Sequence, residues 1–481
     1  MTARISLIPE KNARSYSAPR KMEFKPIINP ARFSEVVGQV PMYSTADVDR
    51  VLSQAQTAFK TWSHTTPDER ASALRAAAGK LRNALPELVP LFVRENGKPI
   101  REAEVDIRRS IELMELVASD LAGWWKPTLV ESDQPVWARR RARGVTAVIS
   151  PWNSPVLLSL KRVAPAIAAG NTVVLKPATF CPLTVMRCVE IINECVPADV
   201  LGVVTGNGST VGEMLAADER VRAIAFTGST ETGRRIMELG SRTVKKFYME
   251  LGGNDPALVL ADATLDSAAI ERMKNAILRA AGQVCIAIKR IYVHQSRYRE
   301  LTEKLSDAFD QVVAGDGLVP ETTMGPLNNK PQFEFVKGLI ERCRSNGLNV
   351  STHGRKLDAA AWAQGFFLLP SIVLGAGPQD EIVQCEQFGP IIPIVAFENE
   401  ADAIMHANDT PYGLRASVWT NERTRAEEIA DRLEAGAVFW NNHGIFKDLH
   451  LEFPGVKQSG FSRESRTAAL DHYVDTYGFA E

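Results

Sequence analysis

The sequence predicts an α/β protein in which short buried strands alternate with helices. Between residues 145 and 250, runs rich in β-branched residues are separated by single helical segments, a pattern typical of parallel strands joined by helical crossovers. A second α/β pattern extends from about residue 254 to residue 450. Because 481 residues are too many for one hydrophobic core, we expect two or three domains.

The composition is ordinary for a globular protein, with 45% hydrophobic and 23% charged residues. A formal net charge of -1 gives no electrostatic reason to expect a nucleic acid or an anionic membrane as a partner. The six cysteines contain no Cys-x-x-Cys pair and no zinc-type cluster, so we expect neither a disulfide framework nor a metal site. We find no secretory signal and no apolar run long enough to span a membrane, which favours a cytoplasmic protein.

The first 125 residues are expected to be mostly helical. Residues 1–40 are predicted to form an extended arm with short strands. Ser44-Thr45-Ala46-Asp47 has the pattern of a capping box at the start of a helix, and Thr66-Pro67 begins a second helix. The helical pattern continues to about Trp125, and the polar stretch 126–143 could form a hairpin that reaches a neighbouring subunit.

The pattern from residue 145 predicts a doubly wound parallel sheet. Strands are expected at residues 145–149, 172–175, 203–204, 223–226 and 244–249, and helices at 155–169, 182–195, 209–217 and 230–240. Ligands of such sheets bind at the C-terminal ends of the strands. Three motifs follow strands in this way: Trp152-Asn153, Lys176-Pro177 and Gly228-Ser229-Thr230.

Cys285 and Glu250 are the candidate chemical groups. Small residues precede Cys285 and leave room for a substrate, and a thiolate is a strong nucleophile. Glu250 follows an apolar run and precedes Gly252-Gly253, a setting that suits a general base over a cleft. The simpler alternatives are a buried structural cysteine and a surface glutamate. Three other cysteines recur every seven residues and are predicted to lie in the core on one helix: Cys181, Cys188 and Cys195.

Other polar and glycine-rich segments could bind a ligand. Asn153 lies between two prolines, where its amide could donate to a developing oxyanion, although asparagine is also frequent in plain turns. The segments 206–212 and 227–233 are glycine-rich turns that open helices, and Ser229 in the second could help to hold a pyrophosphate. Lys176 could reach the ribose or phosphate of a nucleotide, or could be a solvated lysine.

Seven segments together resemble the aldehyde dehydrogenase superfamily in their order and spacing, over about residues 28–475. Each motif is weak alone, but seven in order are specific. The segments are Pro151-Trp152-Asn153, Lys176-Pro177, Phe226-Thr227-Gly228-Ser229-Thr230, Glu250-Leu251-Gly252-Gly253, Gly282-Gln283-Val284-Cys285, Glu386-Gln387-Phe388-Gly389-Pro390 and Lys457-Gln458-Ser459-Gly460.

The resemblance implies a Rossmann-like cofactor domain, a second α/β catalytic domain and a small β oligomerisation element. The cofactor domain would comprise residues 1–122 and 143–252, and the catalytic domain residues 253–450. The oligomerisation element would comprise residues 123–142 and 467–481. The resemblance also implies a homodimer or homotetramer.

The activity implied is the irreversible oxidation of an aldehyde to its carboxylic acid with NAD or NADP. Cys285 would attack the aldehyde carbon, and the Asn153 amide and the Cys285 backbone N–H would hold the oxyanion. Hydride transfer would leave a thioester, and Glu250 would activate the water that hydrolyses it. Lys176 is counted with these catalytic residues and with the cofactor site. The other expected cofactor residues are Ile149, Trp152, Thr179, Gly208, Gly228, Ser229, Glu386 and Phe388.

The sequence departs from the common family pattern at several positions. Thr179 stands where many NAD-preferring relatives have a glutamate, which leads to the hypothesis that NADP is tolerated or even preferred. Ser154 replaces a frequent aromatic residue and could widen the cleft. Ser462 and Ser465 stand where relatives usually have glycine, which puts the backbone geometry there in doubt.

The substrate pocket is expected to include Lys161, Val284 and Ile286, with further walls from residues 439–446. Lys161 occupies a position where certain semialdehyde enzymes have arginine, so it could bind an acidic tail, or it could be a solvent-facing lysine. An aromatic aldehyde is a second possibility. Two alternatives to a hydrolytic enzyme stay open: a coenzyme A-acylating relative, against which Glu250 argues, and a non-catalytic protein with the same fold. A thiol esterase activity could accompany the hydrolytic one.

Overall fold

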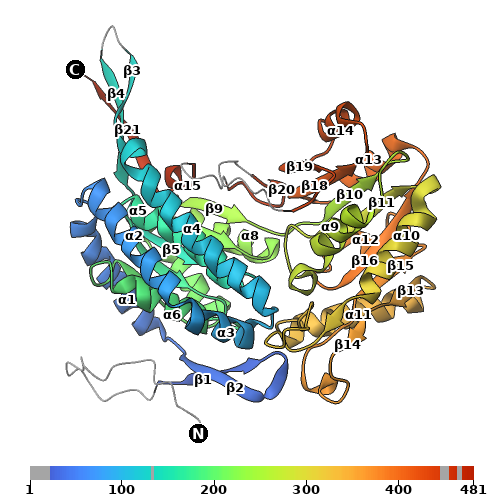
Figure 1. Ribbon diagram of the computed structural model, residues 1–481. Helices are drawn as coiled ribbons and strands as arrows, with labels where there is room; N and C mark the ends of the chain where they lie inside the picture. The colour runs from blue at the N-terminus through green and yellow to red at the C-terminus, as the bar shows by residue number, and fades with distance from the viewer. Residues whose placement is uncertain (1–21, 132–134, 445–453, 463–467, 481) are drawn as a thin grey trace.

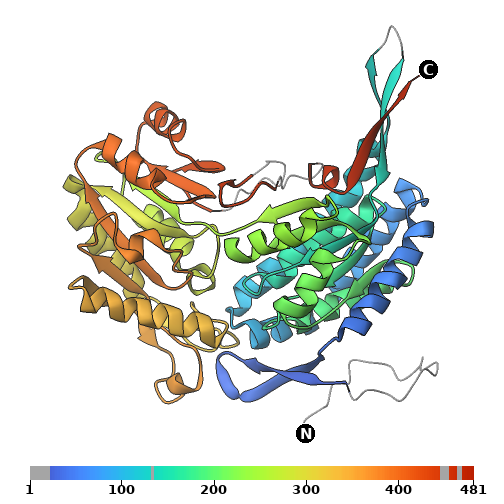
Figure 2. The same cartoon turned by 180° about the vertical axis from the view of Figure 1, so that it is seen from behind.

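The computed structural model describes residues 22–131, 135–444, 454–462 and 468–480. Two α/β lobes lie side by side, and a narrow β-sheet projects from the first lobe (Figure 1). The view from behind shows the same two lobes and the same projection (Figure 2). Among the described helices, none has the length and apolar character needed to cross a lipid bilayer.

The first lobe is built on a five-stranded sheet in the order β7-β6-β5-β8-β9, in which every neighbouring pair is parallel. The strands are β5 (Val145–Ile149), β6 (Thr172–Lys176), β7 (Leu201–Val203), β8 (Val221–Thr227) and β9 (Lys246–Glu250). All five predicted strands are therefore confirmed, with limits that differ by one or two residues. Successive residues of β5 pack on opposite faces, Val148 against one core and Ala147 against the other, because strand side chains alternate.

Helices cover both faces of this sheet. The helices on one face are α1 (Thr45–Trp62), α7 (Glu213–Ala217) and α8 (Thr230–Ser241). Those on the other face are α2 (Pro67–Asn83), α3 (Leu85–Asn96), α4 (Ile100–Trp125), α5 (Pro155–Ala168) and α6 (Leu183–Asn193). The predicted starts of α1 and α2 are confirmed, since Ser44 and Thr66 each form a complete capping box. Gly97 ends α3 in a left-handed conformation, with φ of 94°.

The helix expected at 209–217 is confirmed: its first turn, Gly208–Gly212, is π-helical, and α7 continues it as an α-helix. One local prediction for this lobe was wrong. The three cysteines do not share one helix, because α6 begins after Cys181 and ends before Cys195. Cys181 and Cys188 are fully buried as predicted, whereas Cys195 is only partly buried. Pro197 follows shortly after, and the chain there has left the helix.

The projecting sheet has the antiparallel order β21-β4-β3. Its strands are β3 (Thr128–Glu131), β4 (Val136–Ala142) and β21 (Val474–Ala480), so the expected hairpin is confirmed and a distant strand completes it. The arginines of β4 lie over aromatic rings, Arg139 at 4.1 Å from the centroid of Phe479 and Arg141 at 5.4 Å from that of Tyr477. A second hairpin, β1 (Phe24–Asn29) and β2 (Arg32–Pro41), confirms strands in the N-terminal arm; residues 1–21 of that arm lie outside the described residues.

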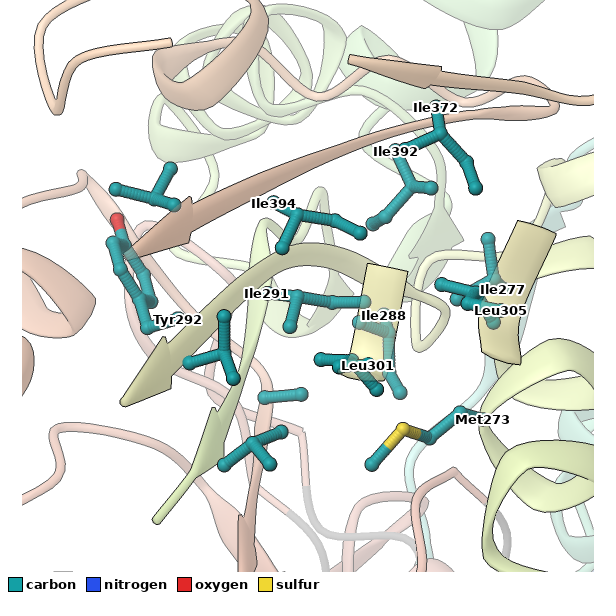
Figure 3. Packing of buried hydrophobic residues seen from close by; sticks show 14 of the residues in the cluster. Met273, Ile277, Ile288, Ile291, Tyr292, Leu301, Leu305, Ile372, Ile392 and Ile394 are labelled. Carbon is teal, nitrogen blue, oxygen red and sulfur yellow. The ribbon is translucent and has the colours of Figure 1, made fainter. Parts of the chain in front are cut away.

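The second lobe holds a seven-stranded sheet in the order β13-β15-β16-β11-β10-β18-β19, parallel except for β13 at its edge. The strands are β10 (Asp255–Val259), β11 (Ile288–His294), β13 (Asn349–Thr352), β15 (Ser371–Leu374), β16 (Ile391–Phe397), β18 (Arg415–Trp419) and β19 (Ala437–Trp440). The main helices are α9 (Ser267–Leu278), α10 (Gln295–Asp310), α11 (Lys330–Ser345), α13 (Glu400–Asn408) and α14 (Arg423–Ala430). Isoleucines of β11 and β16 and leucines of α10 fill the core between them (Figure 3).

Short elements complete the two lobes. They are the strand pairs β12 (Val313–Ala314) with β14 (Arg355–Lys356) and β17 (Tyr412–Gly413) with β20 (Val456–Lys457), and the short helices α12 (Glu381–Gln384) and α15 (Ala468–Asp471). Leu470, Tyr473 and Val474 belong to the core of the first lobe, so the chain returns there after the second sheet. We propose that the domains divide between β9 and β10, after residue 252. The proposed limits at residues 450, 467 and 481 lie outside the described residues.

Candidate active site

The candidate site lies where adjacent strands of the first sheet end. In the observed order, β6, β5 and β8 are direct neighbours, so their C-terminal ends meet at one edge. Lys176 is the last residue of β6, Ile149 is the last of β5, and Gly228 follows β8. Glu250 is the last residue of β9, as the sequence predicted. The topology therefore brings together motifs that are widely separated in the sequence.

The Cys285 loop is a strained turn between α9 and β11. Ala280 and Ala281 both have positive φ, 50° and 55°, a conformation that non-glycine residues rarely adopt. Gly282 also has positive φ, 76°, and a Cβ there would lie 2.2 Å from the carbonyl oxygen of Gly389. Only glycine therefore fits, and the cysteine loop packs directly on the loop that contains Glu386. Cys285 itself is partly exposed.

Asn153 is attached to this cysteine loop. Its side-chain amide donates to the carbonyl oxygen of Gln283 at 3.0 Å, and the residue is 6% exposed. The preceding carbonyl, that of Trp152, accepts a hydrogen bond from Asn96 Nδ2 at 2.8 Å. The first contact holds the turn after β5 against the Cys285 loop and the second holds it against the end of α3, so Asn153 is no ordinary surface asparagine.

Ser154 has a polar role that the sequence did not predict. Its hydroxyl accepts a hydrogen bond of 2.9 Å from Lys98, and the same ammonium pairs with the fully buried Asp106. Asp106 also contacts Arg279, with 3.3 Å between Oδ1 and Nη2. A buried carboxylate between two cations is compensated electrostatically, and Ser154 extends that network to the turn beside Asn153.

Glu250 is 5% exposed, so the alternative of a surface glutamate is wrong. Its carboxylate accepts a hydrogen bond of 2.9 Å from the buried Ser462 hydroxyl. Its backbone carbonyl accepts from the N–H of Gly228 at 3.1 Å, and the residue forms an antiparallel bridge with Gly460. The segment around Gly460 and Ser462 thus fixes the position of Glu250. Residues 463–465 of that motif lie outside the described residues.

Burial, together with the negative charge of Glu250, raises the pKa of the Cys285 thiol to about 12. Lys289 acts in the opposite sense and lowers this pKa. Its ammonium donates to the carbonyl oxygens of Val284 at 2.8 Å and of Cys285 at 2.6 Å. Sequence reasoning did not select Lys289. The available signal was a lysine inside the apolar run Ile286–Ile291 that enters β11.

The loop after α12 contains Glu386 and Phe388, two of the expected cofactor residues. Glu386 Oε1 accepts from the backbone N–H of Gly253 at 3.0 Å, so it lies beside the turn that follows Glu250. Phe388 has a positive φ of 50°, and its ring meets that of Trp152 edge to face at 5.4 Å between centroids. These contacts place both candidate cofactor residues next to the reacting groups.

The far end of the candidate cofactor site contains Lys176 and Thr179. Lys176 is 4% exposed, so the alternative of a solvated lysine is wrong, and burial lowers its pKa to about 8, with a further contribution from Lys25. Thr179 donates to the carbonyl oxygen of Gly206 at 3.2 Å. Gly212, in the π-helical turn Gly208–Gly212, lies beside the Lys176 side chain. A Cβ atom on Gly212 would be 3.8 Å from the Cδ and Cε atoms of Lys176.

The start of α8 suits a phosphate. Ser229 is its N-cap and accepts a hydrogen bond from the Thr232 N–H at 3.3 Å. Nearby, at the end of β8, the buried Thr227 hydroxyl has no hydrogen-bond partner among the described residues. An unsatisfied hydroxyl, the N-terminus of α8, a buried lysine and a carboxylate along one sheet edge fit the polar groups of a dinucleotide.

A cavity of about 240 Å³ lies next to the cysteine loop and is lined by the residues on either side of Cys285 in the sequence. Val284 and Ile286 line it, as expected for the substrate pocket. Its other lining residues are Arg272, Asn275, Ala276, Arg279, Ala287, Asn442, His443 and Gly444. The two arginines were missed by sequence reasoning. Arg279 stands six residues before Cys285. An arginine so close in sequence to the candidate nucleophile was the available signal for a cation in the pocket.

Lys161 does not line this cavity among the described residues. It lies on the partly exposed stripe of α5, together with Leu157 and Leu158, while most other residues of that helix are buried. Of the further pocket walls predicted at residues 439–446, Phe439 is buried and residues 445 and 446 lie outside the described residues.

Comparison with known proteins agrees with this geometry. The family model described as the aldehyde dehydrogenase family matches residues 16–477. The chain belongs to the aldehyde dehydrogenase family. The predicted fold class and the prediction of an NAD(P)-dependent aldehyde dehydrogenase are confirmed at this level.

Individual relatives support the assignment over nearly the whole chain. A glutarate-semialdehyde dehydrogenase of Pseudomonas putida is 34% identical over 452 residues, which are 93% of this chain and 92% of that protein. The structure of an NADP-dependent enzyme of E. coli has a TM-score of 0.90 and 32% identity and covers 95% of both chains. A betaine aldehyde dehydrogenase of Staphylococcus aureus in complex with NAD+ has a TM-score of 0.90 and 29% identity, covering 95% of this chain and 91% of that one.

Proposed function

We propose that this aldehyde dehydrogenase oxidises an aldehyde with an acidic tail to the corresponding carboxylic acid and releases it by hydrolysis. The observation that carries the proposal is the cavity beside Cys285, in which Arg272 and Arg279 adjoin Val284 and Ile286. Guanidinium groups bind carboxylates in a planar, bidentate geometry that a neutral aldehyde cannot use. The glutarate-semialdehyde dehydrogenase relative acts on an aldehyde of this kind, as its name states.

The chemistry begins at Cys285. Loss of the thiol proton gives the thiolate, and attack on the aldehyde carbon forms a carbon–sulfur bond and an oxyanion. The Asn153 amide and the Cys285 backbone N–H are the donors assigned to that oxyanion. The Asn153 amide nitrogen carries two hydrogens, so it can donate one to Gln283 O, as it does at 3.0 Å, and the other to the oxyanion.

The second half of the reaction needs a base. Glu250 accepts a proton from water, and the resulting hydroxide attacks the thioester carbon, so that the acid leaves and the Cys285 sulfur is freed. Burial of Glu250 at the end of β9 supports this role, because a general base works best when bulk water is excluded. Lys176, the last residue of β6, is also proposed as a member of the catalytic set.

The nicotinamide ring supplies the acceptor for the hydride that leaves the substrate. The residues that would hold NAD or NADP are Ile149, Trp152, Lys176, Thr179, Gly208, Gly228, Ser229, Glu386 and Phe388. Of these, Glu386 would accept hydrogen bonds from a ribose and Ser229 would adjoin the pyrophosphate at the N-terminus of α8.

We propose NADP as the preferred cofactor. Thr179 provides no negative charge to repel a 2′-phosphate. Lys176 and its neighbour Lys25 contribute positive charge that would attract such a phosphate. The NADP-dependent enzyme of E. coli is a close structural neighbour, but the enzyme of S. aureus is in complex with NAD+, so the preference needs its own measurement.

The enzyme is proposed to be a cytoplasmic homodimer or homotetramer. All six cysteines are free, which suits a reducing compartment. The projecting sheet offers an oligomerisation surface, with Val130 of β3 67% exposed and Leu129 46% exposed.

The test is reduced-cofactor formation by the purified protein with semialdehydes, neutral aliphatic aldehydes and aromatic aldehydes, each offered with NAD and with NADP. We expect the highest kcat/KM with a semialdehyde and NADP.

Cys285→Ala should abolish turnover and keep cofactor binding, and Glu250→Gln should give one burst of reduced cofactor and then stall. Product analysis with and without coenzyme A distinguishes hydrolysis from acylation. Equal turnover of neutral and acid-tailed aldehydes would refute the proposed preference for a substrate with an acidic tail.

A further inference from the structure

Lys289 joins two parts of the active site. Its ammonium donates to the Cys285 carbonyl oxygen at 2.6 Å and lies 3.9 Å from Glu386 Oε1. It also lies 6.0 Å from the centroid of the Phe388 ring, and its own backbone carbonyl accepts from Gln387 Nε2 at 3.1 Å. Lys289 is 2% exposed, and burying an ammonium costs free energy unless it is paired and hydrogen-bonded.

We propose that Lys289 is a positioning residue that sets the reactivity of the Cys285 thiol and couples it to the binding of the cofactor at Glu386. The inference rests on the proposed function, because it takes Cys285 as the nucleophile and Glu386 as a cofactor ligand. Lys289 acts through both residues and does not itself contact the substrate.

The charges around the thiol explain why a cation is needed. Glu250 at the end of β9, Asp255 at the start of β10 and Glu386 after α12 all disfavour the thiolate by like-charge repulsion. Lys289, at the start of β11, opposes them. Replacing it with a neutral residue raises the pKa of the thiol, and a change of about one unit lowers the thiolate fraction about tenfold at a fixed neutral pH.

The same ammonium also acts on Glu386. Burial raises the pKa of the Glu386 carboxyl, while Lys289 and the Gly253 N–H lower it. Without Lys289, Glu386 carries less negative charge and is a weaker acceptor for a ribose hydroxyl, so cofactor affinity falls about tenfold. In the native protein, cofactor bound at Glu386 changes the field that Lys289 exerts on Cys285, and this coupling is lost in the variant.

The experiment measures the rate of Cys285 alkylation by iodoacetamide as a function of pH, using mass spectrometry of the Cys285 peptide. It uses the whole protein, with and without NADP or NAD, and a fluorescence titration gives the cofactor Kd. Lys289→Met is the test variant, Lys289→Arg is the conservative one, and Lys245→Met is the matched control. Lys245 is 6% exposed and donates to two carbonyl oxygens, Asp218 at 2.6 Å and Val221 at 2.8 Å, away from the cysteine.

We expect Lys289→Met to move the alkylation profile to higher pH, to slow alkylation about tenfold at neutral pH and to abolish the effect of cofactor on its rate. Lys289→Arg should keep the alkylation profile, the alkylation rate and the effect of cofactor close to those of the wild type. Lys245→Met should change none of these three quantities. An unchanged profile and Kd in a folded Lys289→Met protein would overturn the proposal.

A second variant covers the case in which Lys289→Met does not fold. Glu386→Gln, with Lys289 intact, should accelerate alkylation because it removes a negative charge from the thiol's surroundings. Slower or unchanged alkylation in Glu386→Gln would refute the proposal that the charges around Cys285 set the reactivity of its thiol. The alkylation assay needs no aldehyde, so a wild-type protein that oxidises no aldehyde would refute the proposed function while Lys289 is still tested.

Discussion

Ser462 donates a hydrogen bond of 2.9 Å to the carboxylate of Glu250, and both residues are buried. The hydroxyl of Ser462 supplies a donor to the candidate base that a glycine at this position would lack. The segment is anchored by backbone contacts as well, since the Phe461 N–H donates to the Met249 carbonyl oxygen at 3.1 Å. Glu250 is thereby held by both a side chain and the backbone of the 460–462 segment.

We predict that Ser462→Ala slows thioester hydrolysis and leaves hydride transfer unchanged. Losing a hydrogen bond to a carboxylate costs about 1.5–3 kcal/mol. If this hydrogen bond acts in the transition state of thioester hydrolysis, its loss lowers kcat by about tenfold or more. Rapid mixing should then show a full burst of reduced cofactor and a slower steady state. Ser241→Ala, whose hydroxyl binds a helix carbonyl far from the site, is the control. An unchanged steady state would mean that Ser462 only supports the backbone.

Replacing Arg279 with glutamine should weaken binding of acid-tailed aldehydes selectively. Arg279 lines the cavity beside Cys285, and a charge-assisted contact to a carboxylate contributes about 1.5–3 kcal/mol, so KM for a semialdehyde should rise about tenfold or more. KM for a neutral aldehyde should change little. Lys274→Gln is the matched control, since Lys274 on α9 does not line this cavity, although it lines a neighbouring groove that Arg279 also borders. A uniform loss on every aldehyde would instead reflect the contact between Arg279 and Asp106.

Thr179→Glu should reverse the proposed cofactor preference. A carboxylate there would repel a 2′-phosphate and accept hydrogen bonds from the ribose hydroxyls of NAD. We expect the ratio of kcat/KM for NADP to that for NAD to fall by about tenfold or more. Thr179→Gln keeps the size of the side chain without the charge and should cause a smaller change. If both variants keep the wild-type ratio, the determinant lies elsewhere.

Binding of NADP should weaken as the pH rises through about 8. Burial lowers the pKa of Lys176 to about 8, so its ammonium is charged below that pH and increasingly neutral above it. A phosphate binds the charged form, and therefore affinity is full at lower pH and is lost as the proton leaves. Calorimetric titrations should show this dependence for NADP and a weaker one for NAD. Lys176→Met should remove the difference between the two cofactors, and a pH-independent Kd would contradict the role of Lys176.

The sequence predicted those elements whose signals are local. The strands β5 and β6 are buried at every position and are rich in β-branched residues, and the capping boxes at Ser44 and Thr66 are defined by residues three positions apart. The motifs after these strands were found for the same reason, because parallel strands end at one edge of a sheet.

Contacts between distant segments could not be predicted in this way. Lys289 was not selected because its importance comes from Glu386, which the fold brings within 3.9 Å. The helix expected at residues 209–217 is present, but its opening turn, Gly208–Gly212, is π-helical, which the sequence pattern did not specify. Likewise, seven-residue spacing placed Cys195 on a helix that ends at Asn193.

The return of the chain to the first lobe determines the order in which the protein can fold during synthesis. The second sheet uses residues from one continuous stretch, β10 to β19, and needs nothing that the ribosome adds later. The first lobe, although its strands emerge earlier, lacks Leu470, Tyr473 and Val474 in its core and β21 beside β4 until the second lobe has been made. The lobe translated first is therefore the last to be completed.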